Sequence, residues 1–171
     1  MPFNSIFSWL IKKRIHQIEL FKKYPIEVQT ELFAKLISSA EKTEFGKIHG
    51  FSSIRNHTDF KNHVPLQEYE TIKPEIDRSM AGESNVLWPG KTKWFAKSSG
   101  TTSERSKFIP VTKESLEDCH YKGGKDLLGL YYTNFPGCKL YEGKHLIVGG
   151  SAEINPLTSD SYFGDLSAII V

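Results

Sequence analysis

The amino-acid sequence predicts an α/β fold in which a helical N-terminal segment packs on a mixed β-sheet. Apolar residues recur at helical spacing through about the first 85 positions, and short segments rich in β-branched and aromatic residues follow. The third observation is composition: of 171 residues, 39% are hydrophobic and 25% are charged, which suffices for one core and is unlike a disordered chain. We therefore expect one domain or part of one.

The opening segment is predicted to be an amphipathic helix, with Ile11 and Ile15 on its apolar face. Residues 1–25 carry five positive side chains and one negative, which accounts for the basic excess of the whole chain. The pattern fits a helix that docks on the protein with its basic side in water, and it also fits a helix on a membrane surface. Because Arg14 and Lys22 lie close to the apolar stripe, docking is the preferred interpretation.

A second helix is predicted after Pro25, because the apolar residues at 28–40 cover about half of a helical wheel. We expect Gly46 to end this helical run. Two shorter helices are then expected at 59–63 and 68–80. The first half of the chain is thus mostly helical.

The pattern changes in the second half. Three short segments are rich in β-branched and aromatic residues and are predicted to be strands: 86–88, 92–96 and 108–111. A helix is expected over 116–130, with its leucine stripe forming ordinary core. Two more apolar segments, 145–148 and 166–171, are predicted as buried strands, or as a strand and a tight turn. Because natural termini usually lie exposed, the apolar ending indicates a fragment of a longer protein.

Several classes of protein do not fit this sequence. No apolar run approaches the roughly 20 residues of a membrane-spanning helix, and the six histidines lack zinc-ligand spacing. No basic stripe with interleaved aromatic residues indicates nucleic-acid binding. Cys119 and Cys138 form no CxxC pair, so we expect reduced thiols in a cytoplasmic protein. We expect no nucleic acid, no membrane and no metal site among these residues, and Tyr69 is interpreted as a packing residue.

One loop has the composition of a phosphate-binding site. Residues 98–106 contain six serines or threonines in nine positions, and they lie between two predicted strands. A glycine lets the backbone approach an anion, successive amides and hydroxyls donate hydrogen bonds, and a lysine supplies positive charge. Flexible surface loops share this composition, but a loop held by two apolar strands favours a binding site. The candidate binding residues are Ser98, Ser99, Gly100, Thr101, Thr102 and Lys107.

Known nucleotide and hydrolase motifs do not match. Gly90-Lys91-Thr92 has the ending of a Walker A motif, but Asn85 stands where its first glycine is required. The sequence also lacks a G-x-G-x-x-G fingerprint and a G-x-S-x-G elbow.

The same loop resembles the first nucleotide-binding motif of adenylate-forming, luciferase-like enzymes. Ser98-Ser99-Gly100-Thr101-Thr102, followed by Lys107-Phe108-Ile109-Pro110, is similar to that of the auxin-responsive Gretchen Hagen family of acyl-acid amido synthetases. Five further stretches support the resemblance over nearly the whole chain: Thr43-Glu44-Phe45-Gly46, Val64-Pro65-Leu66, Tyr69-Glu70, Leu87-Trp88-Pro89-Gly90 and Gly164-Asp165-Leu166-Ser167.

The resemblance implies an ATP-dependent ligase. A carboxylic acid attacks the α-phosphorus of ATP to give an acyl-adenylate and pyrophosphate, and an amine or amino acid then displaces AMP. The loop would bind the phosphates, with Lys107 as the catalytic counter-charge and Mg²⁺ sharing that task. Glu104 stands about where many relatives carry glycine.

The resemblance also implies that residues 1–171 form the N-terminal part of a large adenylating domain. The family's acidic metal ligand and C-terminal lid have no counterpart before Val171, so we expect the isolated chain to be inactive. The alternative is a non-catalytic nucleotide- or phosphate-binding module, or a degenerate scaffold of the same fold.

Overall fold

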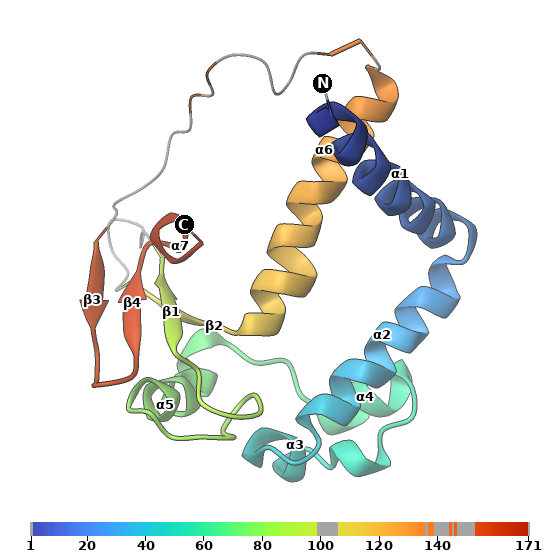
Figure 1. The fold of residues 1–171 in the computed structure, drawn as a ribbon. Coiled ribbons are helices and arrows are strands. Elements are labelled where there is room, and N and C mark those ends of the chain that lie inside the picture. The colour runs from blue at the N-terminus through green and yellow to red at the C-terminus, as the bar shows by residue number, and fades with distance from the viewer. Residues whose placement is uncertain are drawn as a thin grey trace. The chain divides into compact units, whose positions relative to one another are not determined.

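The computed structural model describes residues 2–98, 106–135, 137–138, 144, 146 and 153–170, with side chains from residue 13 onward. The chain divides into two compact units (Figure 1). The first unit consists of Met1–Gln29 and Lys113–Ile147, and the second unit consists of Thr30–Thr112 and Val148–Val171. Each unit thus joins two segments that are distant in the sequence.

The first unit is built on two long helices in contact, α1 (Pro2–Lys23) and α6 (Lys122–Asn134) (Figure 1). Arg14 on α1 donates hydrogen bonds to both carboxylate oxygens of Asp126 on α6, the second at 2.8 Å. Hydrogen bonding to Asp126 raises the pKa of the Arg14 guanidinium. The predicted docking of the opening helix on the protein is confirmed, and α6 is its partner.

The helix predicted over 116–130 is present, but its leucine stripe is not core. A π-helical segment, η2 (Ser115–Tyr121), leads directly into α6. Leu127 is 69% exposed and Leu130 is 44% exposed, so the expectation of buried leucines is wrong. No helix in the described part of the chain combines the length and apolar character that a membrane-spanning segment requires.

The core of the second unit lies against the end of α2 (Pro25–Ala40), which begins at Pro25 as predicted. Ile37 and Ala40 of this helix are buried together with Phe51 and Ile54. Three short helical segments follow α2 in the chain: α3 (Glu44–Ile48), η1 (Phe51–Ser53) and α4 (His57–His63). The C-terminal part of α2 therefore supplies one wall of a core made largely by local neighbours.

Gly46 does not end the second helix, contrary to the prediction, but lies inside α3. Thr43 caps α3, because its hydroxyl oxygen accepts the Gly46 N–H at 3.0 Å while its hydroxyl donates to the Ala40 carbonyl at 2.7 Å. A Cβ at position 46 would lie 2.1 Å from the Ala40 carbonyl oxygen. The glycine is needed for a close approach of two backbones.

The strand predicted at 86–88 is absent, and this segment instead completes the start of α3. The carbonyl oxygens of Asn85 and Val86 accept the N–H groups of Glu44 at 2.8 Å and Phe45 at 3.0 Å. The first N–H groups of a helix have no partner within the helix, so these bonds satisfy them. Residues 86–88 therefore lie in a series of bends whose first residue, the buried Val86, pairs with the start of a helix.

Arg78 links three segments of the second unit at the end of α5 (Tyr69–Met80). Its guanidinium donates to both carboxylate oxygens of Glu44, at 2.6 Å each, and to Glu83 at 2.7 Å. The hydrogen bonds from Arg78 lower the pKa of Glu44 and of Glu83. This cluster joins α3, α5 and the turn after α5.

The strands form one mixed sheet in the order β2-β1-β4-β3. They are β1 (Trp94–Lys97), β2 (Phe108–Val111), β3 (Ile154–Pro156) and β4 (Tyr162–Gly164). β1 pairs antiparallel with β2 and parallel with β4, and β3 pairs antiparallel with β4. Helices α5 and α7 (Leu166–Ile169) contact the sheet. The predicted α/β class with a mixed sheet is confirmed.

Two of these strands agree with the sequence prediction and two were not expected. β2 has the predicted bounds and β1 overlaps the segment predicted at 92–96. Residues 166–171 were predicted as a strand or a tight turn, but residues 166–169 form the helix α7, which starts after the N-cap Asp165. The strand predicted at 145–148 lies almost entirely outside the described residues.

Candidate functional site

The structure describes both ends of the polar loop. Ser98 directly follows β1, and Lys107 directly precedes β2. The other predicted binding residues, Ser99, Gly100, Thr101 and Thr102, lie outside the described residues, as does Glu104. We call Ser98 and Lys107 the base of the loop, and the geometry of the candidate site is described by these two residues and their neighbours.

Two hydrogen bonds close this base. The Ser98 N–H donates to the Lys107 carbonyl at 2.8 Å, and the Lys107 N–H donates to the Ser98 hydroxyl oxygen at 2.9 Å. A hydroxyl that accepts one hydrogen bond still has a proton to donate. Ser98 can thus hold the loop's base and also donate to an anion. The loop leaves the sheet and returns to it at adjacent points.

Tyr69, the first residue of α5, holds β2 from its open edge. Its hydroxyl accepts the N–H of Phe108 at 2.9 Å and makes a longer bond, 3.5 Å, to the carbonyl of the same residue. One side chain thereby satisfies both outward-facing backbone groups of Phe108. The Tyr69 ring also lies 5.5 Å below the ammonium of Lys107, within the range of a cation–π contact.

Tyr69 is the residue of this site that sequence reasoning assigned only to packing. It lies 39 positions before Phe108, and no local spacing connects the two. The only signal in the sequence was the Tyr69-Glu70 pair among the stretches that resemble the synthetase family.

The two lysines that flank the loop differ in position. The ammonium of Lys97 lies 5.8 Å from the Phe163 ring centroid on β4, and Lys97 is exposed. Lys97 pairs with Phe108, so the next pair in the register is Ser98 with Lys107. Because successive residues of a strand point to opposite faces, Lys107 shares a face with Ser98 and Lys97 points to the other. Of the two, Lys107 is the one paired with Ser98 and on the same face as its hydroxyl.

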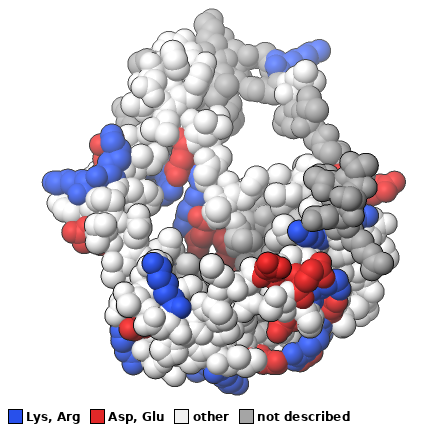
Figure 2. Space-filling model, turned by 180° about the vertical axis from the view of Figure 1, so that it is seen from behind, with Lys and Arg blue, Asp and Glu red and all other residues white. Residues whose placement is uncertain are grey.

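On the face in Figure 2, acidic and basic side chains of the described residues are interspersed and form no continuous basic surface. Within the described ranges, no three His, Cys, Asp or Glu side chains are grouped to hold a metal ion. The loop's base therefore offers donors and one ammonium to an anion, and no metal ligand is assigned.

The sequence matches a family model described as the GH3 family N-terminal domain over residues 14–170. Among curated proteins, indole-3-acetic acid-amido synthetase GH3.2 of Arabidopsis thaliana is 30% identical over 106 residues, covering 61% of this chain and 19% of that protein. Jasmonoyl-L-amino acid synthetase JAR6 of Nicotiana attenuata is 29% identical over 107 residues, covering 62% of this chain and 18% of that protein. The chain thus spans about a fifth of the length of these relatives.

A comparison of folds agrees with the sequence matches. The solved structure of the GH3.15 acyl acid amido synthetase superposes with a TM-score of 0.77 and 24% identity, covering 91% of this chain and 28% of that one. A second structure, AtGH3.15 in complex with 2,4-DB, gives a TM-score of 0.76 and 23% identity, covering 94% of this chain and 28% of that one. These likenesses show the fold.

Proposed function

Because the chain belongs to the GH3 family through its N-terminal domain, we propose that it is the N-terminal part of an ATP-dependent acyl-acid amido synthetase. The family resemblance seen in the polar loop is confirmed by the family match. Relatives named for indole-3-acetic acid and for jasmonoyl conjugates support a small carboxylic acid and an amine or amino acid as the substrates.

The proposed reaction has two steps. The acid attacks the α-phosphorus of ATP to form an acyl-adenylate and release pyrophosphate, and the amine then displaces AMP to form an amide. Neither step needs a protein nucleophile, so catalysis consists of positioning the reactants and stabilising phosphoryl charge. Mg²⁺ would supply further positive charge to the phosphates.

The observation that carries this proposal is the closed base of the polar loop. Two hydrogen bonds join Ser98 to Lys107, and Tyr69 holds the neighbouring residue of β2. We assign phosphate binding to Ser98, Ser99, Gly100, Thr101 and Thr102. Lys107 has the catalytic role, because its ammonium would stabilise the charge that develops on the α-phosphoryl group.

Amide formation is proposed for a complete synthetase. The chain covers 28% of the solved relative. We therefore propose that residues 1–171 are the N-terminal part of the adenylating domain and are inactive in isolation.

The direct test is acid-dependent exchange of labelled pyrophosphate into ATP by the complete gene product. Lys107→Ala should lower the exchange rate by about 10²–10³, the usual effect of deleting one charge-stabilising group. The matched control is Lys97→Ala, which removes an exposed lysine from the opposite face and should leave the rate unchanged. Equal exchange by wild type and Lys107→Ala would refute the role of this lysine. ATP binding without exchange, over a panel of acids, would support the non-catalytic module instead.

Tyr69 is assigned as a positioning residue for Lys107. Tyr69→Phe keeps the ring beneath the ammonium but removes the bonds to Phe108, and we expect a rise of about fivefold in KM for ATP with a smaller change in kcat. Tyr162→Phe removes a hydroxyl whose one hydrogen bond among the described residues is a 3.4 Å contact with the Ser159 carbonyl, and it should change neither constant. A fall in kcat alone for Tyr69→Phe would contradict a role in nucleotide positioning.

A further inference from the structure

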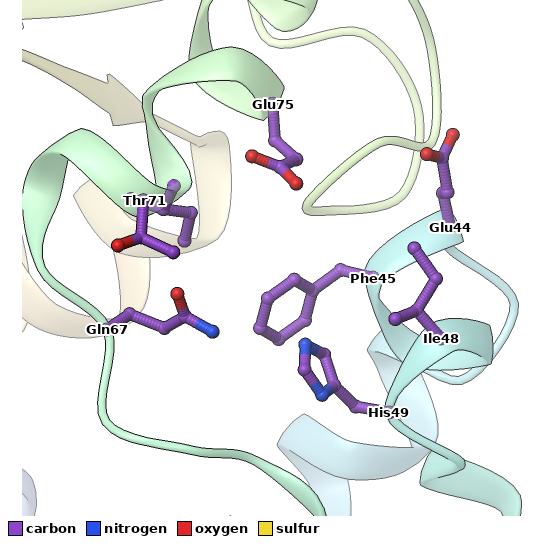
Figure 3. A pocket seen from close by; sticks show the side chains of 8 residues that line it. Glu44, Phe45, Ile48, His49, Gln67, Thr71 and Glu75 are labelled. Atoms are coloured by element: carbon purple, nitrogen blue, oxygen red, sulfur yellow. The ribbon is translucent and has the colours of Figure 1, made fainter.

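A cavity of about 100 Å³ lies within the second unit, between α3 and α5. Figure 3 shows side chains from both helices and from the segment before α5 converging on it. Its walls combine the apolar side chains of Phe45 and Ile48 with the polar side chains of Gln67 and Thr71. None of the residues that close the base of the polar loop lines it, so the nucleotide proposal does not account for it.

Glu75 on α5 points into this cavity toward Phe45 (Figure 3). Its Oε2 atom is buried and has no hydrogen-bond partner among the described residues. Buried polar atoms in folded proteins nearly always have a partner, because an unpaired buried carboxylate oxygen is costly. The terminal torsion of a glutamate is soft, so a small rotation presents this oxygen to the cavity.

The cavity's own side chains do not supply the missing donor. Within the described ranges, the residues that line it include two carboxylates and no lysine or arginine. The Gln67 amide and the Thr71 hydroxyl can donate hydrogen bonds, but neither is bonded to Glu75 Oε2. The second carboxylate, Glu44, already receives two hydrogen bonds from Arg78, whose guanidinium also binds Glu83. His49 is directed elsewhere, because its Nδ1 lies 3.0 Å from the carbonyl oxygen of His63 and must donate to it. Among the described residues that line the cavity, Glu75 is therefore the carboxylate for which the structure shows no cationic partner.

We propose that this cavity binds a small organic cation, a primary ammonium or guanidinium group on a short alkyl chain, with Glu75 as its counter-charge. Phe45 is among the lining residues, and an aromatic ring attracts a cation that lies over its face. The oxygens of Gln67 and Thr71 are further acceptors. A volume of about 100 Å³ is smaller than the roughly 150 Å³ of an apolar cavity that binds benzene, and it suits ligands of the size of ethylammonium or methylguanidinium. The site is independent of the proposed adenylation.

The test is a titration of the full chain with ethylammonium chloride and with methylguanidinium chloride, followed by NMR of the backbone amides. We expect saturable shifts at Phe45, Thr71 and Glu75 with a dissociation constant in the millimolar range, because so small a ligand has few atoms to contribute binding energy. Ethanol, which matches the size without the charge, and sodium chloride, which matches the charge without the shape, should give no saturation. Saturation by either of these, or none by the two organic cations up to about 100 mM, would overturn the proposal.

Three variants locate the site. Glu75→Gln keeps the size of the side chain and should weaken binding at least tenfold. Asp77→Asn makes the same charge change on the same helix at a side chain that is 51% exposed and paired with Lys73, and it should leave binding unchanged. Thr71→Leu, at an exposed position, should weaken binding by filling space without altering charge. Unchanged affinity in Glu75→Gln would overturn the proposal, and a bound water would then explain the buried oxygen. If Glu75→Gln does not fold, unchanged affinity in Thr71→Leu would overturn it in the same way.

Discussion

The two compact units of this chain are held together by different interactions. The second unit has a buried cluster of apolar side chains, and Phe95 at the centre of its sheet is completely buried. Within the described part of the first unit, Gly129 is the only buried residue, and α1 is tied to α6 by the charged pair of Arg14 and Asp126. Both units begin from amphipathic helices, so an apolar stripe becomes core only where a second apolar surface covers it.

The largest effect that distinguishes the units is expected from truncating one buried and one exposed apolar side chain. Phe95→Ala should lower the free energy of unfolding by about 3–5 kcal/mol, because the ring is 0% exposed and its removal leaves a cavity. Leu127→Ala, at a side chain that is 69% exposed, should change it by no more than about 0.5 kcal/mol. Urea unfolding followed by circular dichroism measures both. Equal losses would mean that the first unit has a core comparable to that of the second.

A smaller effect is expected from the charged pair of the first unit. A double-mutant cycle with Arg14→Met and Asp126→Asn should give a coupling energy of about 1 kcal/mol, because the two side chains are 16% and 27% exposed and share two hydrogen bonds. The control cycle uses Glu19 and Lys22 on α1, whose side chains are 60% and 68% exposed, and should give no more than about 0.5 kcal/mol. Equal coupling energies in the two cycles would show that the partial burial of Arg14 and Asp126 does not strengthen their interaction.

The smallest effect concerns the Arg78 cluster of the second unit and appears only in acid. Arg78 lowers the folded-state pKa of Glu44 and Glu83 below the ordinary 4.5, so their contribution to stability is complete above that pH and is lost as the pH falls through the lowered values. Arg78→Gln should therefore flatten the pH dependence of the urea midpoint below about pH 4.5.

The matched control for this last measurement is Arg55→Gln. The Arg55 guanidinium donates to the Ser52 carbonyl at 2.7 Å, and a carbonyl does not titrate. The control should keep the wild-type slope in acid. A wild-type slope in Arg78→Gln would show that other carboxylates cause the acid sensitivity.

The local sequence pattern was sufficient to predict helices and strands whose signals lie within the element itself. The apolar face of α2, the helix α5 and the bounds of β2 all follow from periodicity, Pro25 and short aromatic or β-branched runs. Short apolar runs without such signals were ambiguous. Residues 86–88 and 166–171 both read as strands, but one completes the start of α3 and the other forms α7.

The sequence predicted which residue types make up the candidate site, but it did not predict the contacts that hold them in place. The hydroxyl-rich segment after Ser98 and the cation at Lys107 stand next to each other in the sequence, so they were found directly. Tyr69 could not be found this way, because it meets Phe108 only after α5 packs beside β2. Glu75 is similar, since its lack of a partner becomes visible only once α3 covers it.

The sequence by itself determined the mostly helical first half, the strands β1 and β2, the polar loop between them and the family to which the chain belongs. Those features depend on residues close together in the chain, where spacing and side-chain type act directly. The tertiary structure alone decided that Gly46 meets the Ala40 carbonyl, that Arg14 meets Asp126 and that one tyrosine holds the edge of β2. Such contacts arise from the packing of distant segments, and their partners are set by the shape and charge of surfaces that exist only in the folded chain.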